Sequence, residues 1–132
     1  MRILVINAGS SSLKWQYFDG DQLVIDENIQ RWNPADGFDE IVEAVTAAGG
    51  VDAVGHRVVH GGPKLRETTV IDDDVVAYLK TTVDLAPLHQ PQAIAGIEIA
   101  RAAFPDAVQV ACFDTAFHRT LSAAASTYAL PK

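Results

Sequence analysis

Apolar residues occur along the chain in short runs, and the spacing within each run predicts a strand or a helix. Continuous or alternating apolar positions, which are typical of strands, occupy residues 3–8, 13–18, 22–29, 51–60 and 108–114. Apolar positions at helical spacing occupy residues 38–48, 72–82 and 91–104. Glycine, proline and aspartate lie between these segments and predict the turns.

The order of these elements indicates the fold class. Three strands come first, and the turn Asp19-Gly20-Asp21 between the second and third predicts an antiparallel meander. The later strands and helices do not follow the strict alternation of a Rossmann sheet. We therefore predict an α/β fold with a mixed sheet that opens with the meander and carries helices packed on it. The chain ends at Lys132 without a clear capping element, so we expect a fragment of a longer protein.

Composition and charge narrow the classes of function. The 132 residues are 48% hydrophobic and 20% charged, as in an ordinary folded domain. The formal net charge is -7, from 17 acidic and 10 basic residues, and no Lys/Arg cluster is present, which argues against nucleic-acid binding. An anionic ligand must therefore be held by a few placed cations.

The sequence also bears on location and redox chemistry. The N-terminal apolar run is too short for a signal peptide, and charged residues interrupt the longest helical apolar stretch. We expect a cytoplasmic protein without a membrane span. The single cysteine, Cys112, lies in an apolar run and is expected to be buried.

The first candidate site is the turn at residues 7–14, Asn-Ala-Gly-Ser-Ser-Ser-Leu-Lys. Its backbone N–H groups and the hydroxyls of Ser10 and Ser12 suit a phosphate, and Lys14 supplies a point charge. The segment lacks the glycine spacing of a Walker A loop. Its residues alone leave open an ordinary serine-rich hairpin.

The second candidate site is the strand end at residues 55–62, Gly-His-Arg-Val-Val-His-Gly-Gly. Alternation places Arg57 and Val59 on one face and His56 and His60 on the other. Arg57 beside Val59 suits a ligand with an anionic head and a small apolar end, although a structural ion pair is the alternative. No carboxylate or cysteine nearby completes a metal site, so the histidines are expected to pack or form hydrogen bonds.

Two further candidate sites follow. His89 precedes the predicted helix that opens near Pro91, and a helix N-terminus attracts anions. A role in capping that helix is the alternative. Asp114 directly follows the apolar run of the last strand, a common position for a functional carboxylate at the rim of a sheet, but also for a turn residue. For His118 we expect packing.

Together and in this order, the segments NAGSSSLK, GHRVVHGG, APLHQP, FDTAFH and YALP resemble the successive signatures of the acetate kinases. The resemblance extends from residue 1 to about residue 131. It implies membership of the acetate/sugar kinase, Hsp70 and actin superfamily, whose lobes are ribonuclease H-like. It also implies the reversible transfer of a phosphoryl group between ATP and acetate, with acetyl phosphate as the product.

The resemblance implies roles for the residues that match. Asn7 would help to bind Mg²⁺, and Lys14 would lie on the side of ATP together with Ser10 and Ser12. The residues of the later motifs would then bind the carboxylate substrate.

Among the later motifs, Arg57 would hold the carboxylate or acetyl phosphate, and Val59 and Leu88 would line the pocket for the methyl group. His89 would contact the phosphoryl group in transfer, and Asp114 is the catalytic carboxylate of the family. Because acetate is already ionised at neutral pH, we expect Asp114 to act mainly by holding Mg²⁺ or its waters, although a proton donor/acceptor role is more usually assigned to it.

The chain departs from the family pattern at several positions, and these departures affect the implied roles. The family usually has Asn where this chain has Gln90, and often at Gln92; because Gln is a poor helix N-cap, the positioning of His89 is less secure. The segment 119–122 also differs. We expect residues 1–132 to be the N-terminal lobe of a two-lobe enzyme that is a homodimer at full length, and this piece alone to be inactive.

Three alternatives to an acetate kinase stay open. A propionate kinase shares these motifs, and one carbon in a small pocket is worth only about 1–3 kcal/mol of discrimination. A non-catalytic lobe kept for binding is the second. A sugar kinase is the third, but the face of Arg57 and Val59 suits it poorly.

Overall fold

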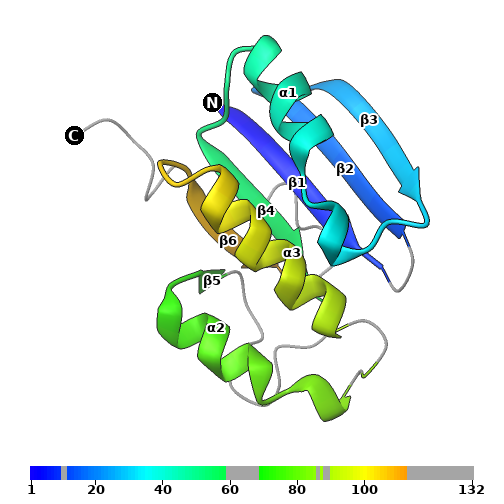
Figure 1. Ribbon diagram of the computed structural model, residues 1–132. Coiled ribbons are helices and arrows are strands. Elements are labelled where there is room, and N and C mark those ends of the chain that lie inside the picture. Colours follow the sequence, from blue (N-terminus) through cyan, green and yellow to red (C-terminus); the bar gives the residue numbers. More distant parts are fainter. Residues whose placement is uncertain (10–11, 59–68, 86, 88–89, 113–132) are drawn as a thin grey trace.

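Six strands form one mixed sheet in this computed structural model, which describes residues 1–9, 12–58, 69–85, 87 and 90–112. Across the sheet the strands lie in the order β3-β2-β1-β4-β6-β5 (Figure 1). Their bounds are β1 Arg2–Ala8, β2 Ser12–Asp19, β3 Gln22–Gln30, β4 Ala53–Arg57, β5 Thr69–Val70 and β6 Val108–Cys112.

The sheet opens with the expected antiparallel meander of β1, β2 and β3. Gly20 closes the turn between β2 and β3 with a φ of 62°, a conformation that glycine adopts without steric cost. Strands β4 and β6 both run parallel to β1. The predicted mixed sheet with an opening meander is therefore confirmed.

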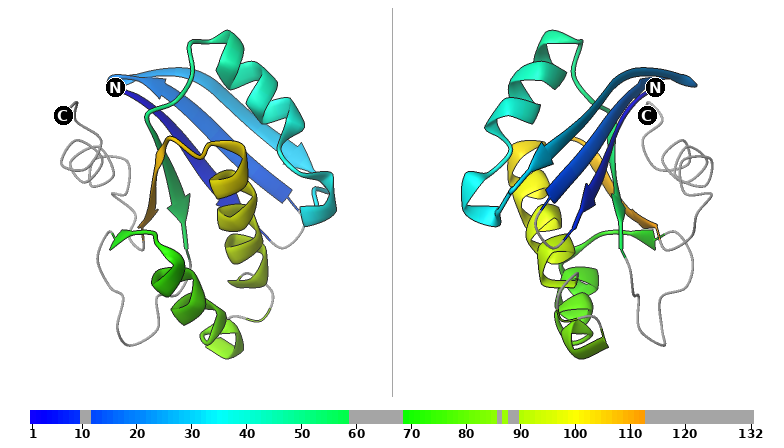
Figure 2. Two further views of the ribbon diagram at one scale, coloured as in Figure 1. Left: turned by 60° about the vertical axis from the view of Figure 1, so that its left-hand side comes forward. Right: turned by 90° about the vertical axis from the view of Figure 1, so that its right-hand side faces the viewer.

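Three α-helices of the described residues cover one face of the sheet (Figure 2). They are α1 (Asp39–Ala47), α2 (Asp73–Lys80) and α3 (Gln90–Ala103), with 3₁₀ turns η1 (Pro34–Asp36) and η2 (Val83–Leu85). In this described part of the chain, none of the helices is both long and apolar enough to cross a membrane.

The main core lies between the sheet and helices α1 and α3. On β1 and β2, every second side chain enters it, as the alternation of a half-covered strand requires. Helix α3 packs against β1 at Gly96, where a Cβ would lie 3.6 Å from that of Ala8. The buried residues of this core are Leu4, Ile6, Ala8, Leu13, Trp15, Tyr17, Trp32, Phe38, Ile41, Val45, Val54 and Ala100.

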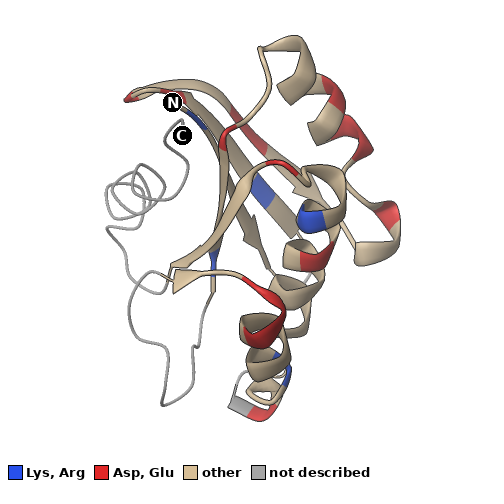
Figure 3. Cartoon of the chain, turned by 90° about the vertical axis from the view of Figure 1, so that its left-hand side faces the viewer, with Lys and Arg blue, Asp and Glu red and all other residues tan. Residues whose placement is uncertain are grey.

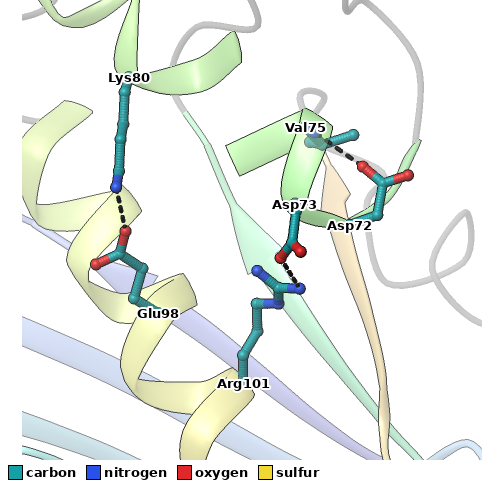
Figure 4. A network of polar contacts seen from close by, with 6 residues as sticks. All are labelled: Asp72, Asp73, Val75, Lys80, Glu98 and Arg101. Carbon is teal, nitrogen blue, oxygen red and sulfur yellow. Dashed lines mark hydrogen bonds and ion pairs between the residues drawn. The ribbon is translucent and has the colours of Figure 1, made fainter. Parts of the chain in front are cut away.

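Helices α2 and α3 are joined at their surface by ion pairs. Arg101 contacts Asp73 and Lys80 contacts Glu98, each at 2.8 Å (Figure 4). Asp72 caps α2, because its Oδ1 accepts a hydrogen bond of 2.8 Å from the N–H of Val75. Because these ion pairs are solvent-exposed, each contributes less than about 1 kcal/mol.

One strand of the sheet was not among the predicted elements. Thr69, which lies outside the predicted strands and helices, begins the two-residue strand β5, which pairs with β6. Such a short strand has no hydrophobic period of its own, and the backbone of β6 holds it. Residues 59–60 and 113–114, predicted as strand ends, lie outside the described residues. Cys112 is fully buried, as predicted.

Candidate functional site

The candidate site lies at the carboxyl end of the parallel strands. In open α/β sheets, ligands bind beyond these strand ends. Asn7 is the second-last residue of β1, and Arg57 is the last residue of the neighbouring strand β4. Because β1 and β4 are parallel, both side chains reach the same edge of the sheet.

Strand register places three of the predicted site residues in one row. Asn7 on β1 pairs with Lys14 on β2. On the other side of β1, Ile6 pairs with His56, so Arg57 comes next to Asn7. The row therefore runs Lys14, Asn7, Arg57 across three adjacent strands.

These three side chains line a single hollow of about 200 Å³. Their neighbours along the strands enter the core under α1 and α3, so the hollow lies on the opposite face of the sheet. The floor includes the buried Val5, two residues before Asn7 on the same face of β1. The lining residues are Val5, Asn7, Lys14, Gln16, Asp26 and Arg57.

The charges of the hollow favour an anionic ligand that lies between two cations. Lys14 and Arg57 are both exposed. Strand β1 lies between the strands that carry them, so their backbones are about 10 Å apart. An anion between them lowers their mutual repulsion. The net charge of the chain is -7, and acidic residues are spread along the described part of the ribbon in Figure 3. The local pair of cations therefore has to provide the attraction.

His56, the neighbour of Arg57, faces the opposite side and enters the core. Its Nε2 lies 2.8 Å from Oε1 of Gln109, whose Nε2 in turn lies 3.4 Å from the carbonyl oxygen of Ala100. The amide oxygen of Gln109 thus accepts a hydrogen bond from the Nε2–H of His56, and among the described residues Nδ1 has no partner. Burial lowers the pKa of His56 to about 4, against the opposing effect of the bond to Gln109.

His56 is consequently neutral at pH 7 and adds no charge to the hollow. The expectation that it packs and forms hydrogen bonds is confirmed. Within the described ranges, no three His, Cys, Asp or Glu residues gather as a metal site.

A backbone hydrogen bond joins the end of β1 to the start of β2. The N–H of Gly9 donates a hydrogen bond of 2.8 Å to the carbonyl oxygen of Ser12, which closes the hairpin. Ser12 belongs to β2, and it is not among the residues that line the hollow.

Sequence comparison identifies the protein family. The model of the acetokinase family matches residues 35–132, which is most of the chain. The chain belongs to the acetokinase family. The predicted resemblance is therefore confirmed at the level of the family.

Individual acetokinase relatives agree with this assignment. The acetate kinase of Acetivibrio thermocellus is 38% identical and is matched by 99% of this chain. Among solved structures, the acetate kinase of Entamoeba histolytica is 32% identical with a TM-score of 0.73 over 100% of the chain. A propionate kinase from Francisella tularensis is also 32% identical, with the same TM-score over 90% of the chain. The fold is the predicted ribonuclease H-like lobe of the actin-like ATPases.

The chain is shorter than these acetokinases. It spans 41% of the Acetivibrio protein and 39% of the Entamoeba chain. The alignment with the Acetivibrio protein extends over 167 positions, although this chain has 132 residues, so that relative has additional residues inside the matched region.

The remaining predicted residues of the acetokinase site lie outside the described residues. These are Ser10, Val59, Leu88, His89 and Asp114. Gln90, expected to be a poor N-cap, is the first residue of α3 and is fully buried, and its Nε2 donates a hydrogen bond of 2.7 Å to Oγ1 of Thr82.

Sequence reasoning missed two residues of the hollow, Gln16 and Asp26. Gln16 follows Lys14 by two positions, so alternation alone could have placed it on this face. Asp26 could not be placed in this way. The register of β2 and β3 shifts between Tyr17 and Phe18, which leaves Val24 without a partner and sets Asp26 opposite Gln16. Without this bulge, Asp26 would face the helices.

Proposed function

We propose that residues 1–132 form the N-terminal lobe of an ATP-dependent acetate kinase, which transfers a phosphoryl group reversibly between ATP and acetate. The observation that carries this proposal is the row of Lys14, Asn7 and Arg57 around one hollow. Family membership supports the kinase class. Because the proposed reaction consumes ATP, we expect a cytoplasmic enzyme.

The chemistry explains why cations and amides are needed. Acetate is ionised at neutral pH, so its oxygen attacks without the help of a strong base. The difficulty is to bring two anions together and to stabilise the charge on the phosphoryl group. Lys14 and Arg57, held on two rigid strands, supply positive charge where the anions would meet.

Each residue of the site has a proposed role. Arg57 binds the carboxylate of acetate or acetyl phosphate, and Val59 and Leu88 surround its methyl group. His89 contacts the phosphoryl group, and Asp114 acts as the catalytic carboxylate by holding Mg²⁺ or its waters.

On the nucleotide side, Lys14 and the hydroxyls of Ser10 and Ser12 bind the phosphates of ATP. These groups belong to the turn between β1 and β2 and to the start of β2. A turn of this kind offers several donors to phosphate oxygens at once.

The described residues fit a magnesium ion. Mg²⁺ prefers oxygen ligands, and the hollow contains the amide oxygen of Asn7 and the carboxylate of Asp26. Asn7 is the residue that we propose as a ligand. When bound, the ion neutralises negative charge on the phosphate oxygens.

Propionate phosphorylation is the second candidate function. The propionate kinase from Francisella tularensis matches this chain with the same identity and TM-score as the Entamoeba acetate kinase. One carbon in an apolar pocket changes affinity by about 1–3 kcal/mol, so the two acids must be compared directly. A higher kcat/KM for propionate would replace acetate in the proposal.

Arg57 provides the test of the proposed substrate site. In the full-length product of this reading frame, Arg57→Ala should lower kcat/KM for acetate roughly a hundredfold, because a charge-assisted contact is lost. Arg57→Lys should recover only part of this, since an ammonium cannot contact a carboxylate in the bidentate manner of a guanidinium.

Arg101→Ala is the matched control for this test. It removes the same charge from the surface pair with Asp73, away from the hollow, and should change kcat/KM less than about twofold. Equal kinetics in Arg57→Ala and Arg101→Ala would refute a role for Arg57 in substrate binding.

A further inference from the structure

Asp26 places a negative charge in a hollow whose other charged residues are cations. Among the described lining residues, it is the one acidic side chain, and it is exposed. It lies opposite Gln16 on the neighbouring strand. Lys14 pairs with Asn28, two residues after Asp26, so Asp26 and Lys14 are diagonal neighbours. Diagonal residues on neighbouring strands are about 7–8 Å apart, so the carboxylate acts on the space that a ligand of Lys14 would enter.

Among the residues that the structure describes, the carboxylate of Asp26 forms no ion pair. In the described part of the chain, the two ion pairs that join α2 and α3 involve neither Asp26 nor Lys14. The hollow is open to water on this side, but the spacing is within a Debye length of about 8 Å at physiological salt. An anion that binds to Lys14 therefore meets repulsion from Asp26.

This repulsion depends on the charge of the ligand. Free ATP carries several negative charges, and a bound divalent cation cancels two of them. Because the Coulomb energy is proportional to the charge of the ligand, Asp26 penalises the free nucleotide more than its magnesium complex. The carboxylate also accepts hydrogen bonds from the hydration shell of the metal, which Mg²⁺ largely retains.

We propose that Asp26 is a specificity-determining residue that makes this site favour the Mg²⁺ complex of ATP over free ATP. The proposal rests on the proposed function, in which Lys14 binds the phosphates of the nucleotide. The bulge at Val24 is the structural device that brings Asp26 to this face.

The test is calorimetric binding of ATP to the full-length protein, once with a chelator and once with saturating Mg²⁺. In Asp26→Asn, the Kd for free ATP should fall roughly threefold to tenfold at low ionic strength. The Kd for the magnesium complex should fall by the square root of that factor or less, because the lower charge of the complex reduces the Coulomb energy in proportion. The ratio of the two Kd values therefore shrinks. Asp26→Glu, which retains the charge, should keep the ratio of the wild type.

Glu27→Gln is the matched control. This neighbour pairs with Trp15, which faces the helices, so Glu27 lies on the opposite face from the hollow and its neutralisation should leave the ratio unchanged. A ratio in Asp26→Asn equal to that of the wild type would overturn the proposal. Wild-type protein that binds neither form of ATP and makes no acetyl phosphate would instead refute the proposed function itself.

Discussion

Arg57 and His56 show how one strand serves both the core and the surface. They are consecutive on β4, so their side chains point to opposite faces. Arg57 enters the hollow as a permanent cation, whereas His56 is buried and held neutral beside Gln109. The same five-residue strand therefore contributes positive charge to the site and an uncharged imidazole to the core.

His56 makes the stability of the chain depend on pH. Its pKa is about 4 in the folded chain and 6.5 in the unfolded chain, so as the pH falls the unfolded chain takes up the proton first. The contribution of His56 is present above pH 6.5 and is lost as the pH falls toward 4. Between pH 7 and pH 4.5 we expect a loss of about 2 kcal/mol in the free energy of unfolding.

Urea unfolding, followed by tryptophan fluorescence, measures this effect. The two tryptophans, Trp15 and Trp32, are both buried in the core and report its opening. His56→Gln removes the titrating group, so its free energy of unfolding should fall less steeply over the same pH range. Parallel pH profiles for the wild type and the variant would contradict the buried neutral histidine.

At this scale the sequence predicts part of the site and not the rest. Asn7, Lys14 and Arg57 could be predicted because each lies in a motif at the end of an apolar strand. Their convergence then follows from strand pairing. The position of Asp26 opposite Gln16 could not be predicted, because this pairing depends on the bulge at Val24.

At the scale of elements, helix α3 packs against β1 at Gly96, and this contact leaves room for a methyl group. A Cβ at this position would lie 3.6 Å from that of Ala8, 3.8 Å from Cγ2 of Ile6 and 3.9 Å from Cζ of Phe38. These are ordinary van der Waals distances, so alanine fits without moving the helix. Because alanine favours a helix interior over glycine, Gly96→Ala should raise the free energy of unfolding by about 1 kcal/mol.

Gly50→Ala is the opposite case and serves as the control. Gly50 has a φ of 88°, which strains any residue with a Cβ, so this substitution should destabilise the chain by about 1 kcal/mol or more. Urea midpoints of both variants test the two expectations together. A destabilising Gly96→Ala would mean that α3 lies closer to β1 than the structure has it.

The elements with a clear hydrophobic period could be predicted, and those held by other contacts could not. Helix α3 was expected from residue 91 and begins at Gln90. By contrast, η1 falls in a segment expected as a loop, where Asn33 and Asp36 form a capping box. Trp32 anchors this segment, since it is buried and its Nε1 donates a 3.0 Å hydrogen bond to the carbonyl oxygen of Gly37.

For the molecule as a whole, the hollow is small in relation to a nucleotide. Its volume of about 200 Å³ is below the roughly 300–1,000 Å³ of typical ligand pockets. The chain spans 41% of the Acetivibrio acetate kinase, so we propose that the remaining walls belong to a second lobe.

Residues 1–132 alone should therefore have no measurable turnover of ATP and acetate. In the proposed function, the cations of the hollow bind an anion, and the second lobe is needed to align the two substrates. A coupled assay for acetyl phosphate on the purified chain measures this, with a folded state verified by tryptophan fluorescence. Turnover by the isolated chain would refute the two-lobe account.

The most direct test of the central claim is the formation of acetyl phosphate from ATP and acetate by the full-length product of this reading frame, with Mg²⁺ present. We predict turnover in the wild type and its loss in both Arg57→Ala and Asp114→Ala, with propionate as the comparison substrate. A folded full-length protein that phosphorylates neither acid would contradict the account and would leave these motifs a role in binding alone.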